Sequence, residues 1–260
     1  MEKYFAKSVK TDFKDIYWNL PEQKRGVLGV LGGHAGQFRT AVKVAEYAVR
    51  TLPVAEVKLA LPRVLEGKVP SSPDIAFLTA TESGSFADGN EIGDFFGKAD
   101  ANMVVGDLSK NVVTGRVVTE VLESVDRPTV ITRDTVDLVT ETGADGCLMN
   151  PAVTVVGSVA QLSKMLRAIY YPKMLLMSQS LVQVAEVLHK LTLSYPAGIA
   201  TFHDGQIVVA IDGEVRAVPI AETEWTVLTL WGGELAARMV CYQMFNPGDK
   251  LGATVAAVLG

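Results

Sequence analysis

Residues Arg25 to Gly33 read Arg-Gly-Val-Leu-Gly-Val-Leu-Gly-Gly, a short apolar run that ends in two glycines. Such a run, bounded by glycine, is typical of a strand that is buried on both faces. The apolar residues that follow recur at helical spacing, with charged residues between them, and are Phe38, Ala41, Val42, Ala45, Val49 and Leu52. A strand, a glycine turn and an amphipathic helix in this order predict the first unit of an α/β fold.

The same alternation continues along the chain. Apolar runs predict strands at 57–61, 75–79, 102–105, 129–132 and 153–156, and apolar periodicity predicts helices at 113–122, 158–170 and 178–191. Strands that alternate with helices form βαβ units, in which helices cover both faces of a mostly parallel sheet. We therefore expect a three-layer αβα fold.

The last third of the chain has a different pattern. Residues 198–220 predict two or three antiparallel strands, because Asp204-Gly205 and Asp212-Gly213 are strong signals for tight turns. Further helices are expected over 233–245 and from 253 to 259. No repeat, low-complexity tract or Ser/Gly-rich linker interrupts the sequence, so we expect residues 1–260 to form a single α/β domain.

Composition narrows the class of protein. Of the 260 residues, 48% are hydrophobic, which is enough for a real core and excludes a disordered chain. The net charge is -5, so we expect no nucleic-acid partner, because neutralising phosphates needs clustered Lys and Arg. No stretch approaches the roughly 20 apolar residues of a membrane helix, and residues 1–14 lack an apolar signal core. We expect a cytoplasmic protein with no membrane partner.

Two glycine corners stand out, because ligands of open parallel sheets bind outside the carboxyl ends of the strands. The amides of Gly32-Gly33-His34-Ala35-Gly36 could hold an anion with the help of the helix dipole, although a plain β-to-α turn is the simpler interpretation. Neither a Walker loop nor the dinucleotide fingerprint is present. In Trp231-Gly232-Gly233-Glu234, the Glu234 carboxylate could stabilise the start of the next helix or act as a general base.

Other polar residues also follow predicted strands. Asp107, Ser109 and Lys110 come after one strand, and Arg133 and Asp134 come after another; solvated loop charges are the simpler interpretation of both groups. The sequence shows no serine elbow, zinc-ligand spacing or paired-acid signature. With only Cys147 and Cys241, it has too few cysteines for a disulfide framework. No residue is therefore assigned as a metal ligand.

The order of these motifs resembles the ribokinase-like superfamily and, more narrowly, the ADP/ATP-dependent NAD(P)H-hydrate dehydratases. Residues 24–33 and the alanine-rich helix after them resemble the family's first strand, glycine turn and helix. Residues 99–106 resemble the strand before its Gly-Pro-Gly-Leu-Gly loop, and residues 127–138 resemble its Pro-Val-Val-Asp-Ala-Asp-Ala-Leu segment. Residues 232–236 fall where the family has Gly-Thr-Gly-Asp and a helix. The resemblance covers most of the chain in order.

Several of the family's motifs are altered here. Glu234 takes the place of the aspartate in the final glycine loop. The Gly-Pro-Gly-Leu-Gly loop is replaced by residues 106–110, which read Gly-Asp-Leu-Ser-Lys. The Thr-Pro-His-Pro-Gly-Glu motif has no counterpart near residues 153–158, and Lys-Gly-x-Gly-Thr is replaced by Phe-His-Asp-Gly-Gln at 202–206.

The resemblance implies a lyase that uses ATP or ADP with Mg²⁺. The terminal phosphoryl group would pass to the hydroxyl of hydrated NADH or NADPH, and loss of phosphate would regenerate the dihydronicotinamide. Glu234 would be the catalytic base, with nucleotide and anion contacts from Gly232, Gly233, Gly205 and Gln206. The substrate would contact Gly33, His34, Thr40 or Ala41, Gly106 and Asp107.

Two other functions fit the same fold. The chain could be a catalytically degenerate ribokinase-like protein with a binding or assembly role, as the altered motifs suggest. It could also be a kinase for another small hydroxylated molecule, because one fold supports many chemistries. The family resemblance further implies a homo-oligomer.

Overall fold

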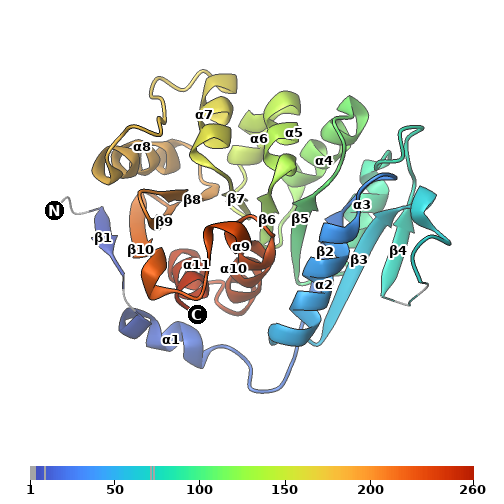
Figure 1. Ribbon diagram of the computed structural model, residues 1–260, viewed down its shortest axis with the longest axis horizontal. Coiled ribbons are helices and arrows are strands. Elements are labelled where there is room, and N and C mark those ends of the chain that lie inside the picture. The colour runs from blue at the N-terminus through green and yellow to red at the C-terminus, as the bar shows by residue number, and fades with distance from the viewer. Residues whose placement is uncertain (1–3, 9, 71, 73) are drawn as a thin grey trace.

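The computed structural model describes residues 4–8, 10–70, 72 and 74–260, and its central feature is one sheet of ten strands (Figure 1). The strand order is β1-β10-β9-β8-β7-β6-β5-β2-β3-β4. The strands are β1 (Phe5–Lys7), β2 (Val27–Gly32), β3 (Glu56–Pro62), β4 (Ile75–Leu78), β5 (Ala101–Gly106), β6 (Thr129–Thr132), β7 (Val153–Val156), β8 (Gly198–His203), β9 (Gln206–Ile211) and β10 (Glu214–Pro219).

The seven strands from β2 to β8 all run parallel to one another. β9 runs antiparallel to both β8 and β10, while the short β1 pairs parallel to β10. The carboxyl ends of β2 to β8 therefore share one edge of the sheet, which we call the carboxyl edge. The Asp204-Gly205 turn between β8 and β9 lies at this edge too.

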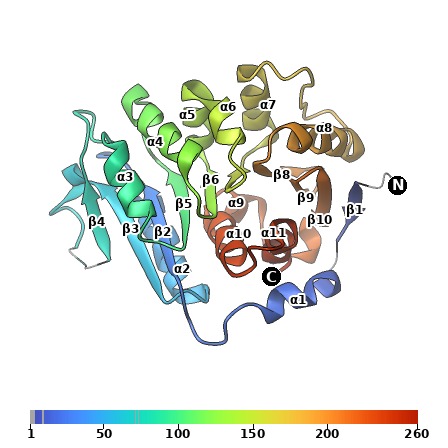
Figure 2. The same ribbon diagram turned by 180° about the vertical axis from the view of Figure 1, so that it is seen from behind.

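Helices cover both faces of the sheet, as Figures 1 and 2 show. One face packs against α3 (Gly89–Phe96), α4 (Val112–Ser124), α5 (Asp134–Thr142), α6 (Ala144–Leu148), α7 (Val159–Ala168) and α8 (Leu181–Ser194). The other face packs against α1 (Lys14–Trp18), α2 (Arg39–Thr51), α9 (Val227–Leu230), α10 (Glu234–Phe245) and α11 (Lys250–Leu259). The short 3-10 helices are η1 (Lys10–Phe13), η2 (Arg63–Leu65) and η3 (Ile220–Glu222). This arrangement confirms the expected αβα fold with a mostly parallel sheet and late antiparallel hairpins.

Local sequence explains where several helices begin. Ser158 and Ser180 start α7 and α8 with capping boxes, in which the serine hydroxyl and a glutamine three residues later satisfy each other's main-chain amides. Asp88 and Asn111 cap α3 and α4 in a similar way. Within the described part of the chain, no helix has the length and apolar character needed to cross a membrane.

Candidate functional site

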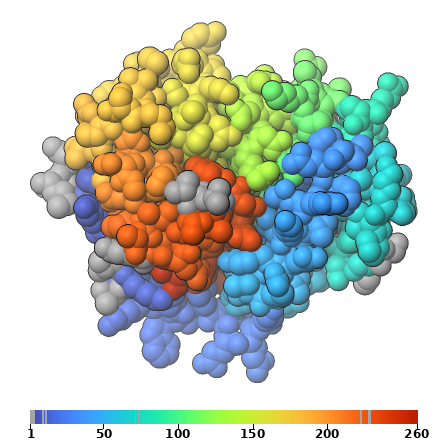
Figure 3. All heavy atoms as spheres, in the orientation of Figure 1, coloured from blue at the N-terminus to red at the C-terminus, as the bar shows by residue number. Residues whose placement is uncertain are grey.

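The two glycine corners of the sequence lie against one side chain, Val105 at the end of β5. A Cβ at Gly32 would lie 2.5 Å from Val105 Cγ1, and a Cβ at Gly233 would lie 2.8 Å from Val105 Cγ2. The same Cβ at Gly233 would lie 3.0 Å from Val44 Cγ2 of α2. The turn after β2 and the start of α10 therefore meet at the carboxyl edge. In Figure 3, the orange residues of this C-terminal segment border the blue residues of α2.

The turn after β2 uses its own amides within the protein. Four of them donate to carbonyl oxygens: Gly33 to Gly106 (2.9 Å), His34 to Gln37 (2.8 Å), Ala35 to Gly84 (2.8 Å) and Gln37 to His34 (3.1 Å). An amide that already donates to a carbonyl has no hydrogen left for an anion. The turn therefore serves to fix the position of α2, and these four amides do not form an anion site.

His34 and Thr40 are the polar side chains of this corner. His34 Nδ1 lies 2.8 Å from the main-chain oxygen of Asp107. A carbonyl oxygen only accepts, so Nδ1 carries a proton, and in the tautomer with a single ring proton this leaves Nε2 as an acceptor. Of the alternatives Thr40 and Ala41, Ala41 is fully buried beneath Gly32, whereas Thr40 keeps some exposed surface.

An ion pair lies at the centre of the carboxyl edge. Arg133 Nη2 lies 3.1 Å from Asp107 Oδ1, and Arg133 Nη1 donates to the main-chain oxygen of Trp231 at 2.9 Å. The Asp107 side chain is only 4% exposed, and its Oδ2 has no hydrogen-bond partner among the described residues. The interpretation of Arg133 and Asp107 as solvated loop charges is therefore wrong, because their charges are paired with each other inside the protein.

The side chain of Asp134 holds the loop that follows β5 in place. Its carboxylate accepts hydrogen bonds from the amides of Asp107 at 2.7 Å and of Leu108 at 3.3 Å. The backbone on both sides is strained, since Asp107 has φ 57° and Arg133 has φ 61° with ψ -140°. Non-glycine residues rarely adopt such angles, and they gather at functional sites where surrounding contacts enforce them. The strain marks this edge as the candidate site.

The start of α10 differs from these two loops, whose amides donate hydrogen bonds to groups of the protein. No side chain caps this 12-residue helix, and its first residue, Glu234, is half-buried. The Glu234 carboxylate makes no hydrogen bond or ion pair with the residues that the structure describes. Uncapped amides at a helix start, together with the helix dipole, favour an anion. Glu234 beside them is a carboxylate able to accept a proton.

The surroundings of Glu234 are partly buried. Burial raises the pKa of Tyr47 on α2 to about 12; Arg238 lowers it, and Glu224 and Glu234 raise it further. Glu234 is therefore close enough to α2 to act on a tyrosine there. The carboxylate forms no ion pair with a lysine or arginine among the described residues.

The predicted nucleotide contacts, Gly205 and Gln206, lie at the same edge but in a filled region. Phe202 and Ile207 flank their turn and pack with Trp231 around a cavity of about 10 Å³. That volume is at the lower limit for one water molecule. Gly205 itself is open, because a Cβ there would meet no atom within 4 Å. A nucleotide base would therefore have to bind outside this packed cluster or displace Trp231.

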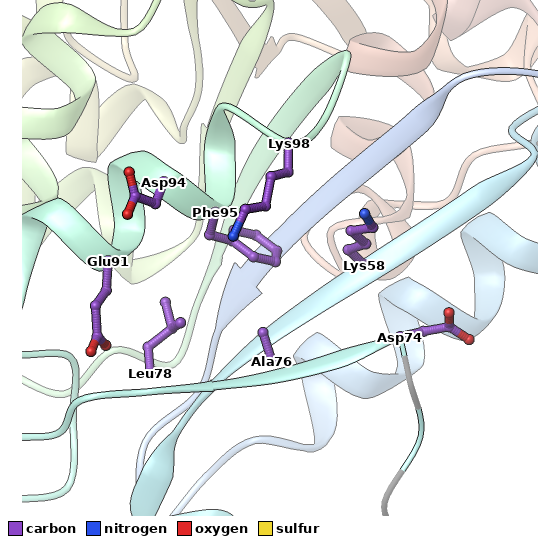
Figure 4. Close-up of a pocket in the computed structure, with 8 residues that line it drawn as sticks. All are labelled: Lys58, Asp74, Ala76, Leu78, Glu91, Asp94, Phe95 and Lys98. Atoms are coloured by element: carbon purple, nitrogen blue, oxygen red, sulfur yellow. The ribbon is translucent and has the colours of Figure 1, made fainter.

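A larger hollow lies away from these residues, at the outer strands (Figure 4). It has a volume of about 280 Å³ and lies between β3, β4 and the helix α3. Two lysines and three acidic residues contribute to its lining, and Glu91 is held by the amide and hydroxyl of Thr79 at 2.6 and 2.8 Å. Neither here nor elsewhere in the described ranges do three or more His, Cys, Asp or Glu side chains form a group that could hold a metal ion.

Sequence reasoning located the corners but missed Trp231 and the roles of Arg133 and Asp134. Their position in the sequence could have indicated these roles, because Arg133 and Asp134 directly follow β6, at the edge where ligands bind. Their interpretation failed because it considered each loop alone. The contacts of Arg133 reach residues 26 and 98 positions away, and such pairings are not visible in a single sequence.

Comparisons with known proteins support the fold. No family model and no curated protein matches the sequence. Among solved structures, a hypothetical protein of Streptococcus mutans has a TM-score of 0.67 at 12% identity, covering 98% of this chain and 88% of its own. The ADP/ATP-dependent NAD(P)H-hydrate dehydratase of Bacillus subtilis, co-crystallised with ATP and Mg²⁺, has a TM-score of 0.58 at 15% identity, covering 94% and 83%. Bacillus subtilis pyridoxal kinase, solved with ADP, has a TM-score of 0.52 at 14% identity, covering 91% and 89%.

These likenesses confirm the ribokinase-like fold that the order of motifs predicts. They extend over nearly the whole of this chain, at identities between 12% and 15%. Function depends on the residues of the site and not on the fold alone.

Proposed function

We propose that the chain binds ATP or ADP at the carboxyl edge and transfers the terminal phosphoryl group to a hydroxyl of a small molecule. The observation that supports this proposal is the start of α10, where uncapped amides lie beside the unpaired carboxylate of Glu234. Arg133 donates to the carbonyl oxygen of Trp231, three residues before Glu234, and so fixes the position of this corner. Phosphoryl transfer depends mainly on positioning and on charge stabilisation, and both are available here.

We propose hydrated NADH or NADPH as the substrate, which would make the protein a dehydratase. Glu234 accepts the hydroxyl proton while the hydroxyl oxygen attacks the terminal phosphorus and the nucleotide leaves. The carbon–oxygen bond to the new phosphate then breaks, and a proton leaves the neighbouring carbon to give the dihydronicotinamide. Of the two amides predicted to form the anion hole, that of Gly232 already donates to the main-chain oxygen of Thr229 at 3.1 Å. The amide of Gly233, together with that of Glu234, therefore stabilises the charge on the transferred group.

The remaining contacts follow from position. The substrate lies along Gly33, His34, Thr40, Gly106 and Asp107, with His34 Nε2 available to accept a hydrogen bond. The nucleotide approaches the Gly205-Gln206 turn from the open side of Gly205. Magnesium would be held mainly by the phosphates, as is usual for this ion, because Asp107 pairs with Arg133 and the Asp134 carboxylate accepts from main-chain amides. A single domain, a homo-oligomer and a cytoplasmic location remain proposals as well.

Thermal unfolding tests the nucleotide site. A ligand that binds only the folded protein raises its stability, so ATP or ADP with Mg²⁺ should raise the melting temperature in a concentration-dependent way. Inorganic phosphate with Mg²⁺ serves as the control for a general anion effect. If neither nucleotide raises the melting temperature at about 10 mM, which is ten times a Kd of about 1 mM, the nucleotide proposal fails.

The dehydration step has a direct assay, because it restores the near-ultraviolet absorbance of the reduced nicotinamide. Glu234→Gln keeps the shape of the side chain and removes the base, so the rate should fall by about 10²- to 10⁴-fold. Glu46→Gln, on the exposed side of α2, is the matched control and should leave the rate unchanged. Equal rates for the wild type and Glu234→Gln would show that another group is the base.

A second candidate function rests on a different observation. Amides of the loops after β2 and β5 already donate hydrogen bonds to groups of the protein. The cavity beside Trp231 has a volume of only about 10 Å³. A fold that has filled its ligand space fits a binding or assembly role without catalysis. This candidate predicts no thermal response to nucleotides, whereas a kinase for another substrate predicts a response and a phosphorylated product without dehydration.

A further inference from the structure

One side of the molecule, along α8, exposes much of the apolar surface. Of the twelve large apolar side chains that stay exposed among the described residues, six lie between residues 170 and 193. We call these six residues the α8 strip: Tyr170, Met174, Leu176, Met177, Val182 and Leu193. Single exposed apolar residues are normal, but a group of them on one surface marks a binding site for a protein or a membrane.

The segment between α7 and α8 runs alongside α8, as both views of the ribbon show (Figures 1 and 2). At the end of α8, the ring of Tyr171 lies 6.4 Å from that of Tyr195. At the start of α8, the main-chain oxygen of Gln179 lies 2.7 Å from Nε2 of His203, the last residue of β8. The α8 strip therefore extends along the whole length of this helix.

Internal contacts hold the segment between α7 and α8 in one shape. The Gln179 side chain accepts from the amide of Leu176 at 2.9 Å and donates to the main-chain oxygen of Met174 at 3.3 Å. Leu175, between these two residues, is buried. The neighbouring apolar side chains are thus fixed at the surface, and such preorganised groups lose less conformational freedom when they bind a partner.

Tyr170 is the most exposed residue of the strip, at 93%. It directly follows α7 and has φ 54°, a left-handed conformation that ends many helices but suits glycine or asparagine better than tyrosine. An exposed ring makes few contacts within the chain that could offset this strain. The side chain therefore points to a contact outside the chain, since strained residues gather at functional sites.

Basic residues surround the strip. Residues 159–195 contain four basic residues and one acid, in a chain whose net charge is -5. The basic residues are Lys164, Arg167, Lys173 and Lys190. The acid, Glu186, pairs with both Lys173 and Lys190, and Lys164 pairs with Asp137 of α5. Arg167 forms no ion pair with a described residue, so a net positive charge remains beside the apolar side chains.

This charge distinguishes between two kinds of partner. A symmetric contact between two copies would place the basic residues of one strip against those of the other, and like charges across an interface repel. An anionic membrane surface suits both parts of the strip. Its headgroups attract lysine and arginine, and apolar side chains enter the boundary between headgroups and acyl chains. Tyrosine favours this boundary, because its ring is apolar and its hydroxyl is polar.

We propose that the α8 strip binds the surface of an anionic membrane. Its apolar side chains enter the boundary region, while Arg167 and the neighbouring lysines lie against the headgroups. Binding of this kind needs no spanning helix. It differs from the expectation of no membrane partner, which was based on the lack of a long apolar stretch in the sequence. It is also independent of the proposed phosphoryl transfer.

Sedimentation of the full-length protein with vesicles tests this proposal. The vesicles contain phosphatidylcholine, either alone or with about 30% phosphatidylglycerol, an anionic lipid. At low salt the protein should pellet with the anionic vesicles and much less with the neutral ones. Binding should weaken in about 1 M salt, where the Debye length is about 3 Å.

Two pairs of variants connect binding to the strip, and all four change exposed residues. Met177→Ser removes an apolar side chain and should weaken binding at least about fivefold. Val49→Ser, on α2 at the opposite face of the sheet, is its matched control. Arg167→Gln removes one charge and should weaken binding about fivefold. Its control, Arg50→Gln on α2, should bind as the wild type does.

The proposal is overturned if the wild type does not pellet with anionic vesicles at low salt. It is also overturned if Met177→Ser and Arg167→Gln bind as tightly as their controls. Sedimentation equilibrium without vesicles examines the other partner. Self-association that Met177→Ser abolishes, in a protein that binds no vesicles, would assign the strip to a second copy of this chain instead.

Discussion

The guanidinium of Arg133 donates a hydrogen bond of 2.9 Å to the main-chain oxygen of Trp231, and this bond joins two corners of the fold that are 98 residues apart. The same guanidinium pairs with Asp107 at 3.1 Å, so three loops meet at one side chain. The carboxyl edge is therefore assembled before any ligand arrives. Its geometry depends on a charge pair that is largely removed from water.

Replacing Arg133 by methionine should destabilise the protein strongly. Asp107 is 4% exposed, and without Arg133 its carboxylate would be a buried charge with no partner. We expect a loss of about 2–4 kcal/mol in the free energy of unfolding, at the lower end for a buried pair because Arg133 is 26% exposed. Urea unfolding of Arg133→Met measures this loss.

The control for Arg133→Met is a double variant. Asp107→Asn removes the charge that Arg133 neutralises, so Arg133→Met combined with Asp107→Asn should be more stable than the sum of the two single effects predicts. A coupling energy of at least about 1 kcal/mol is expected for a direct pair. Strictly additive effects would mean that Arg133 acts through Trp231 alone.

Gly233→Ala should disturb the start of α10. Gly233 has φ 98°, and the new Cβ would lie 2.8 Å from Val105 Cγ2. Backbone strain and the steric clash together should cost about 2–4 kcal/mol of stability. Gly205→Ala is the matched control, because Gly205 also has positive φ, at 70°, but no atom within 4 Å of a Cβ. It should lose only about 1 kcal/mol in urea unfolding, and equal losses would show that the clash is relieved without cost.

Much of the fold could be predicted from the sequence because its strands are local apolar runs. The predicted bounds 129–132 and 153–156 are those of β6 and β7, and the helix at 233–245 is α10 within one residue. The Asp204-Gly205 and Asp212-Gly213 turns connect β8, β9 and β10 as expected. Each of these elements carries its own signal, either an uninterrupted buried run or a turn sequence with one favoured conformation.

The elements that were missed depend on distant partners or have mixed signals. The helix α3 contains Gly89 and Gly93, which lower helix propensity, although Asp88 supplies a cap that could have indicated it. The strand β1 has three residues and is held by β10, while the ring of Tyr4 just before it stacks on His189 of α8 at 3.9 Å. Within the candidate site, the glycine positions follow from the sheet rule. The hydrogen bonds that the loop amides donate to distant carbonyl oxygens and to Asp134 could not be predicted in this way.

Both cysteines should be inert in the folded protein. Burial raises the pKa of Cys147 to about 12, with Glu123 adding to it, and burial raises that of Cys241 to about 12 against the effect of Arg238. From an ordinary value of 9.0, this lowers the thiolate fraction by about 1,000-fold near pH 8. Iodoacetamide, with labelling read by mass spectrometry, should therefore modify neither residue in the native state.

Unfolding provides the comparison for the cysteine prediction. In urea both thiols should be labelled at the rate of a free cysteine. Rapid native labelling of Cys241 alone would mean that the α10–α11 packing opens locally, whereas rapid labelling of Cys147 would mean that α6 does.

Lys250→Met should change how stability depends on pH. Lys250 is a base whose pKa falls from 10.5 to about 8 on folding, so between these pH values the unfolded chain binds more protons than the folded one. Its contribution to stability therefore rises with pH across this window, and below pH 8 it is a penalty of about 3 kcal/mol. Methionine removes the titration. It also removes the donors to Pro151 and Val153, a loss that we expect to be independent of pH.

Comparing the wild type with Lys250→Met at each pH separates the titration of Lys250 from that of tyrosines and cysteines, because those residues are the same in both proteins. Relative to the wild type, Lys250→Met should be most stable below pH 8 and should lose this advantage steadily as the pH approaches 10.5. Lys43→Met, at an exposed position of α2, should show a constant difference over the same range. Urea unfolding at a series of pH values measures both curves. Parallel curves for the wild type and Lys250→Met would show that Lys250 has an ordinary pKa in the folded protein.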